Sequence, residues 1–222
     1  MAPRSQLFGR TFIGTGPGSR QMAFTFDDGP NDPHTLRLLE VLAKHEVKAT
    51  FFLIGKYVAR RPEIAQAIAR AGHVIGNHTY NHPNLVFTSP SQLTWEIDAC
   101  ERALQEAVGE HSRLFRPPFG GRRPDVLRKA RAMGYEPVMW SVSGRDWRLN
   151  TAEDVLRHLA MRIRGGDVIL LHDGGHSHLG ADRSHSVGAT DRLLSRGKQE
   201  GFEFVTVLEM MNGNLGQGQR PA

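Results

Sequence analysis

Residues 22–30 read Met-Ala-Phe-Thr-Phe-Asp-Asp-Gly-Pro, an uncharged run that leads directly into two carboxylates and a turn. A short apolar run of this kind is typical of a β-strand covered on both faces. Neighbouring side chains at a strand end point in different directions, so Asp27 and Asp28 can serve different partners, one a cation and the other water or a substrate. An Asp-Gly turn that only ends the strand is the competing interpretation, and the stretch by itself leaves both open.

Similar apolar runs recur along the chain and alternate with segments of helical periodicity, which indicates an α/β domain. The predicted strands are Met22–Phe26, Ala49–Ile54, Val74–Gly76, Pro137–Val142, Val168–Leu171 and Phe202–Val205. Proline, serine and glycine signals bound the predicted helices, which occupy residues 33–45, 62–72, 89–109, 124–133, 151–165 and 187–200.

Repeated β–α units fold either as a doubly wound sheet or as a barrel. The glycines at positions 14, 16 and 18 precede a strand instead of following one and lack the third glycine of a nucleotide-binding loop, so they predict a flexible lead-in. A complete eight-fold barrel takes around 250 residues. At 222 residues, the chain is expected to form a barrel with a missing or distorted unit.

Composition excludes several classes of protein. With 39% hydrophobic and 23% charged residues the chain is globular, and no apolar run approaches the roughly 18 residues of a membrane span. The single cysteine, Cys100, excludes an internal disulfide and lies on an apolar helical stripe, where we expect it to be buried. The net charge is +5, but basic residues are scattered and not interleaved with aromatics, so nucleic acid is not an expected partner. The first residues show no secretory leader, and the compartment stays undecided.

Two histidines follow the predicted strand Val74–Gly76. His78 and His82 lie four positions apart, and one helical turn would aim both imidazoles at a single metal ion. The spacing alone is a weak signal, and the glutamate of a His-Glu-x-x-His metalloprotease is absent. An aspartate from the first stretch completes an Asp-His-His set, which holds zinc or another divalent ion with positions left open for water and substrate.

Three further segments place reactive side chains after predicted strands or at rigid turns. They are Arg116-Pro-Pro-Phe119-Gly, Asp146-Trp147 and Leu170-Leu-His172-Asp. A histidine at a strand end is a natural general acid, because a neighbouring carboxylate raises its pKa. Each segment alone has an ordinary structural interpretation as a turn, a surface pair or a core histidine.

Together, and in this order, the five segments resemble the motifs of the NodB-type polysaccharide deacetylases, carbohydrate esterase family 4. The resemblance covers about residues 20–210 and implies a distorted, incomplete (β/α) barrel with seven to eight strands in a single domain. We expect a lead-in over residues 1–20, a catalytic domain over residues 21–212 and a flexible tail over residues 213–222. Phe119 and Ser143 depart from the pattern, since many relatives carry tyrosine and aspartate there.

The resemblance implies a role for each residue of the site. The implied metal ligands are Asp28, His78 and His82, with zinc as the expected ion and cobalt, nickel or manganese as alternatives. Asp27 would be the catalytic base and His172 the acid, with Arg116 paired to the base and Asp146 to the acid. The substrate side is implied to consist of the Phe119 backbone N–H, as oxyanion donor, and the walls of the acetyl pocket, Trp147 and Leu170.

The expected function is hydrolysis of acetyl groups from N-acetylated, or alternatively O-acetylated, sugars of a glycan, by a monomer. A related amidase acting on small linear or cyclic amides is the main alternative. Two histidines and a carboxylate also suit a non-haem iron oxygenase, and a non-catalytic carbohydrate-binding protein is a third alternative. The glycine-rich stretch with His176, His178 and His185 is either part of the substrate groove, an adventitious metal site or a mobile rim, and the sequence leaves its role open.

Overall fold

A parallel β-sheet forms the centre of the protein, described here by a computed structural model that covers residues 5–217. The strands are β1 Gln21–Asp27, β2 Thr50–Leu53, β3 Val74–Asn77, β4 Leu114–Phe115, β5 Glu136–Pro137, β6 Val142–Ser143, β7 Val168–His172 and β8 Glu203–Phe204. Their order is β5-β4-β3-β2-β1-β7-β6, all neighbours are parallel, and β8 pairs with the start of β1. The sheet curls without pairing β5 to β6, which confirms the predicted incomplete barrel.

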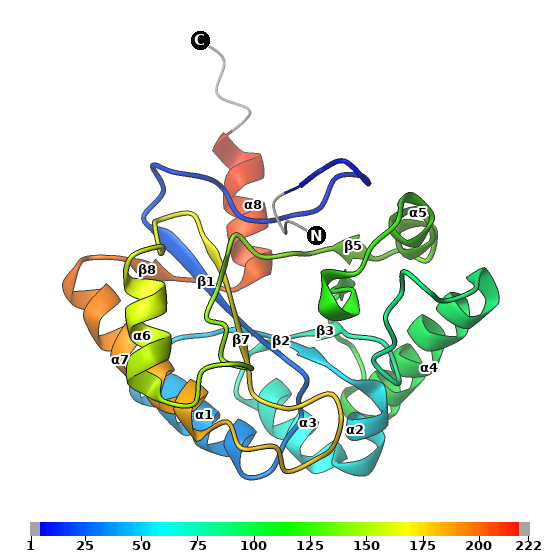
Figure 1. The fold of residues 1–222 in the computed structure, drawn as a ribbon, viewed down its shortest axis with the longest axis horizontal. Coiled ribbons are helices and arrows are strands. Elements are labelled where there is room, and N and C mark those ends of the chain that lie inside the picture. The colour runs from blue at the N-terminus through cyan, green and yellow to red at the C-terminus, as the bar shows by residue number, and fades with distance from the viewer. Residues whose placement is uncertain (1–4, 218–222) are drawn as a thin grey trace.

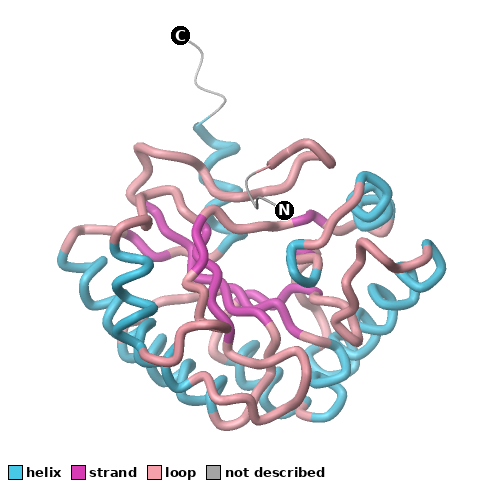
Figure 2. The backbone as a smooth tube through the Cα atoms, in the orientation of Figure 1, coloured by secondary structure: helices cyan, strands magenta, loops and turns pink. Residues whose placement is uncertain are grey.

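Helices surround the strands in an arc (Figure 1; Figure 2). They are α1 His34–Lys44, α2 Gly55–Arg60, α3 Pro62–Arg70, α4 Pro90–Val108, α5 Pro124–Ala132, α6 Ala152–Ala160, α7 Ser184–Gln199 and α8 Val207–Gln217, with a 3₁₀ turn at Pro118–Gly120. All six helices predicted from the sequence are present. The expected caps of α4 and α6 form, because the Ser89 and Thr151 hydroxyls accept the backbone N–H groups of Gln92 and Asp154. None of the helices in residues 5–217 has the length and apolar character needed to cross a membrane.

The apolar core has an outer layer and an inner layer. The outer layer packs the sheet against the surrounding helices, and its largest members include Phe24, Phe26 and Phe51. In the inner layer, Val207 and Met210 of α8 pack with Ala23 and Val168, near the starts of β1 and β7. Helix α8 therefore fills the end of the barrel where the strands begin, and the opposite end, where they finish, is left for side chains that carry chemistry.

The predicted strand Pro137–Val142 was wrong as a single element. Only its two ends belong to strands, β5 and β6, although the Val138 N–H still donates to Phe115 of β4 and the Ser141 N–H to Val168 of β7. The Arg116 guanidinium donates hydrogen bonds to the carbonyl oxygens of Val138 and Met139, and Val138 also forms a β-bridge with Phe12. The two-residue strand β4 and the six-residue helix α2 were missed because they are too short to show a period. Helix α8 was missed because its apolar residues are only weakly gathered on one face.

The segment before β1, expected to be flexible, pairs with the domain at two points. Phe12 forms a bridge with Val138 and Gly14 with Asp167, so the lead-in runs across the gap between β5 and β6. Gly14 has a φ of +122°, and a Cβ there would overlap the Gly166 carbonyl oxygen. At the other end, α8 continues to Gln217, so residues 213–217 of the expected tail are helical; residues 218–222 lie outside the described part of the chain.

Candidate active site

Side chains from the ends of several strands converge on a cavity of about 380 Å³. The parallel sheet brings these ends together, because every strand finishes on the same side. The cavity is lined by Asp27, Asp28, His78, His82, Phe119, Trp140, Trp147, Leu170, His172, His176 and Arg183. Eight of the ten residues singled out from the sequence are in this lining. The other two, Arg116 and Asp146, are buried behind it and bond to cavity residues.

The structure brings Asp28, His78 and His82 into one buried cluster, in which their ligand atoms lie within 4.8 Å of one another. The Asp28 Oδ1 atom lies 3.5 Å from His78 Nε2 and 3.2 Å from His82 Nε2. Burial would raise the pKa of Asp28, but the imidazoles of His78 and His82 beside it hold that pKa well below its usual value. Burial lowers the pKa of His82, which favours the neutral ring that a metal requires.

This donor set fits a divalent cation. The His78 Nδ1 atom lies 2.7 Å from the Arg116 carbonyl oxygen, so it donates there and leaves the Nε2 lone pair directed at Asp28. Within residues 5–217, the buried atoms Asp28 Oδ1 and His82 Nδ1 have no hydrogen-bond partner. One carboxylate and two imidazoles on one side of a cavity are a common ligand set for zinc with an open position.

The predicted helical turn between the two histidines was wrong, because residues 78–82 form a loop. Thr79 and His82 have φ values of +66° and +63°, in the left-handed region. Hydrogen bonds within the loop hold this shape, since the Asn77 side chain accepts the Thr79 N–H at 2.9 Å and the Thr79 hydroxyl accepts the His82 N–H at 3.1 Å. The loop, not a helical period, aims both rings at Asp28.

Glu96 of α4 anchors this loop and was missed in the sequence. Its carboxylate accepts the backbone N–H groups of Tyr80 at 3.0 Å and Asn81 at 2.7 Å, and it is only 2% exposed. A signal for it existed, because Glu96 shares the apolar face of α4 with Leu93 and Cys100. A carboxylate on a buried helical face needs polar partners, which here are the amides of the histidine loop.

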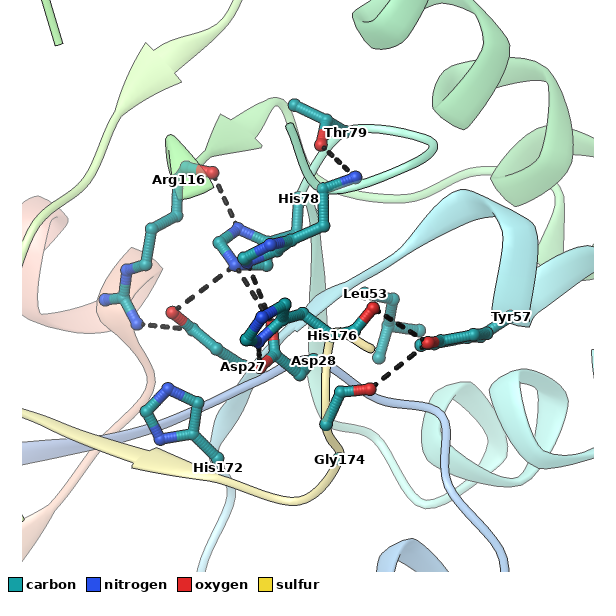
Figure 3. A network of polar contacts seen from close by, with 12 residues as sticks. Asp27, Asp28, Leu53, Tyr57, His78, Thr79, Arg116, His172, Gly174 and His176 are labelled. Carbon is teal, nitrogen blue, oxygen red and sulfur yellow. Dashed lines mark hydrogen bonds and ion pairs between the residues drawn. The ribbon is translucent and has the colours of Figure 1, made fainter. Parts of the chain in front are cut away.

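Asp27 forms a buried ion pair with Arg116 (Figure 3). The guanidinium donates to Asp27 Oδ1 and to the Thr25 hydroxyl, both at 2.7 Å, and lies over the Phe52 ring. The other oxygen, Oδ2, lies 3.7 Å from His78 Nε2, on the side of the Asp28-His78-His82 cluster. Asp27 thus has one oxygen fixed by a cation and one oxygen directed into the cavity.

Across the cavity, His172 is held by Asp146. His172 Nδ1 lies 2.9 Å from Asp146 Oδ1, and the same carboxylate accepts the His172 backbone N–H and the Ser186 hydroxyl at 2.7 Å each. Burial alone would lower the pKa of His172, but the Asp146 charge and hydrogen bond raise it to about 9. His185 Nε2 lies 2.7 Å from the Asp146 carbonyl oxygen, so it supports this pair from α7.

Apolar side chains complete the walls of the cavity. Trp147 packs edge-on against His172 with ring centroids 5.2 Å apart, and Leu170 precedes His172 by two positions on β7. Phe119 has a φ of +56°, and its ring lies 4.5 Å from that of His82. The wall is therefore apolar beside the histidines and open to solvent, since the Phe119 and Trp147 side chains are largely exposed.

The three histidines whose role the sequence left open have different surroundings. The His176 ring stacks on His82 with centroids 4.9 Å apart and lines the cavity. His185 bonds to Asp146, as described above, and His178 is exposed. Hydrogen bonds hold the backbone of the segment that carries His176, because the Tyr57 hydroxyl donates to the Gly175 and His176 carbonyl groups. Figure 3 shows Tyr57 beside this segment.

Comparison with known proteins places this site in a family. Residues 15–138 match the polysaccharide deacetylase family. A peptidoglycan-N-acetylglucosamine deacetylase of Bacillus cereus is 38% identical over 192 residues, which cover 86% of this chain and 87% of that protein. A chitooligosaccharide deacetylase of Bradyrhizobium sp. is 36% identical over 88% of this chain and 92% of its own length.

Solved structures agree. The Bc1960 peptidoglycan N-acetylglucosamine deacetylase, in complex with 4-naphthalen-1-yl-N-oxidanyl-benzamide, superposes with a TM-score of 0.83 at 35% identity, covering 90% of this chain and 92% of that one. With the family match over more than half of the chain, these likenesses leave no doubt about its class. The chain belongs to the NodB-type polysaccharide deacetylases of carbohydrate esterase family 4, and it is a hydrolase of that class.

Proposed function

We propose that this enzyme is a metal-dependent deacetylase that removes acetyl groups from N-acetylated sugars of a polysaccharide or oligosaccharide. The observation that carries the proposal is the placement of two differently tuned groups on one cavity beside the Asp-His-His cluster. Asp27 is held by a buried cation, and His172 is held by a buried anion. A cation beside one group and an anion beside the other suit the first to act as a base and the second to act as an acid.

The metal ligands in this proposal are Asp28, His78 and His82. A divalent ion held there, with zinc as the first choice and cobalt, nickel or manganese as alternatives, would polarise the acetyl carbonyl group and lower the pKa of water. Asp27 Oδ2 accepts the proton of the attacking water, while the ion pair through Oδ1 holds the carboxylate in place. The Phe119 backbone N–H is the proposed donor to the oxyanion that then forms.

His172 completes the reaction. An amine leaves poorly unless it is protonated, so the collapse of the tetrahedral intermediate needs an acid on the leaving-group side. With a pKa of about 9, His172 carries its proton at neutral pH and can donate it from Nε2 as the C–N bond breaks. Acetate and a free amine on the sugar are the products. Trp147 and Leu170 are the proposed walls around the acetyl methyl group.

Acetate release across a substrate panel tests the proposal. The panel contains N-acetylglucosamine oligomers, peptidoglycan, O-acetylated xylan, and small linear and cyclic amides. Release from the N-acetylated glycans, lost with a chelator and restored by zinc or cobalt, is the expected result. Turnover of the small amides alone would assign the chain to an amidase, and glycan binding without any release would make it a carbohydrate-binding protein. Oxygen consumption with iron would point to an oxygenase instead.

A further inference from the structure

A second cavity of about 410 Å³ lies beside the active site, and the two cavities share Trp140 in their walls. We call it the basic cleft, because its lining contains three arginines, one histidine, two serines and no aspartate or glutamate. The basic residues are Arg145, Arg162, Arg164 and His158. The Ser143 hydroxyl can donate a hydrogen bond into the cleft, whereas the Ser141 hydroxyl already donates to Asp167 at 2.6 Å.

One carboxylate borders the basic cleft, since Asp167 accepts the Ser141 hydroxyl at 2.6 Å and the Arg164 backbone N–H at 2.7 Å. Within the described residues, the three arginine side chains themselves are not held in ion pairs, whereas Arg157 and Arg192 on the neighbouring helices pair with Asp154 and Glu153 at 3.0 Å. Burial, and then the charges of Arg162 and Arg145, lower the pKa of His158. Unpaired guanidinium groups gathered around a cavity attract anions and match the planar geometry of carboxylate and phosphate groups.

We propose that the basic cleft binds a carboxylate group carried by the glycan chain whose acetyl group lies in the active site. This inference rests on the proposed function, since the adjoining cavity must hold an acetylated sugar. A neutral chitooligosaccharide gains nothing from such a cleft, while a glycan with acidic substituents is held by both cavities at once. The enzyme is therefore selective for an anionic glycan.

Two substrates of equal length test this selectivity. One is a neutral N-acetylglucosamine oligomer, and the other carries a free lactyl carboxylate on alternate sugars. The double variant Arg162→Gln/Arg164→Gln is expected to lower kcat/KM for the anionic oligomer roughly tenfold and to change that for the neutral oligomer less than twofold. The matched control, Arg157→Gln/Arg192→Gln, removes the same charge from nearby helices outside the cleft and should preserve the selectivity. Added salt should weaken only the anionic preference of the native enzyme.

Equal losses for the two substrates, or no loss for either, would overturn the proposal. Calorimetric titration with the anionic oligomer, with the neutral one as reference, decides the matter independently of turnover. If the native enzyme releases no acetate from either oligomer, the proposed function fails. Tighter binding of the anionic oligomer to native protein than to the double variant would still establish that the basic cleft binds the anionic group.

His176 supports a second, separate inference. Its ring lies nearly parallel to that of His82, at 22° with centroids 4.9 Å apart, and its Nδ1 atom lies 3.9 Å from Asp28 Oδ2. Phe119 meets it edge-on at 5.1 Å. The backbone carbonyl of His176 accepts the Tyr57 hydroxyl at 2.9 Å, which holds the His176 backbone beside the cluster.

We infer that His176 is a positioning residue that covers the metal site by stacking on His82 and slows release of the bound ion. His176→Ala should speed transfer of zinc to a chelator roughly 10- to 100-fold, whereas His178→Ala, an exposed histidine of the same segment, should leave the rate unchanged. His176→Phe retains a stacked ring and should keep release slow. Release from the Ala variant at the native rate, or from the Phe variant as fast as from the Ala variant, would refute the inference.

Discussion

Asp146 Oδ1 lies 2.9 Å from His172 Nδ1, and the carboxylate is almost completely buried. A buried histidine without a partner would titrate below its ordinary pKa of ~6.5, because burial disfavours the charged ring. Here the carboxylate reverses the shift and raises the pKa of His172 to about 9. In the proposed function, where His172 is the acid, this pair sets the pH range over which the acid is protonated.

This pair predicts the alkaline limit of activity. Since the acid must carry a proton, kcat/KM should fall as the pH rises through about 9. In Asp146→Asn the largest cause that raises the pKa of His172 is gone and burial remains, so the limit should move to lower pH. The folded-state pKa lies above the ordinary value, so the pair also stabilises the fold below pH ~6.5 and loses that contribution as the pH rises through 9. A pH profile of acetate release measures the first effect, and an unchanged limit in the variant would contradict it.

Asp27 Oδ2 and His78 Nε2 lie 3.7 Å apart, but replacing the two residues should affect turnover and metal binding differently. Asp27→Asn keeps the three ligands and removes the proton acceptor, so turnover should fall roughly 10²- to 10⁴-fold with metal content unchanged. His78→Ala removes a ligand, so metal and activity should be lost together. Metal analysis of each purified variant beside its rate of acetate release makes the comparison. Near-normal turnover in Asp27→Asn would end its assignment as the base.

Glu96 should matter for metal binding although it touches no ligand side chain. It holds the amides of Tyr80 and Asn81 between the two histidines, so Glu96→Ala should release the loop and weaken metal affinity roughly 10- to 100-fold. Glu106, exposed on the same helix, provides the control in Glu106→Ala. Competition with a chelator measures both affinities. Equal affinities in the two variants would show that the loop keeps its shape without Glu96.

The meeting of the three predicted ligands could be anticipated from the sequence, because parallel strands bring their ends to one side. The shape of the histidine loop could not. It depends on positive φ values at Thr79 and His82 and on a carboxylate from a helix that begins eight residues after His82. The split of the predicted strand Pro137–Val142 could not be predicted for a similar reason. Carbonyl groups in the middle of this segment accept hydrogen bonds from Arg116, which lies more than twenty residues earlier in the chain.

Gly174 lies where a side chain has no room. A Cβ at this position would overlap the carbonyl oxygen of Asp28 and lie 3.0 Å from the Gly29 backbone nitrogen. Both neighbours are backbone atoms beside the metal cluster, so Gly174→Ala must displace the Asp28 segment instead of a flexible side chain. We expect a lower melting temperature and weaker metal binding. Gly213→Ala in α8, where the added Cβ meets only the end of a glutamine side chain, should leave both unchanged. If Gly174→Ala binds metal with native affinity, the Asp28 turn can move without disturbing the ligand. The close packing of these two segments would then play no part in positioning Asp28.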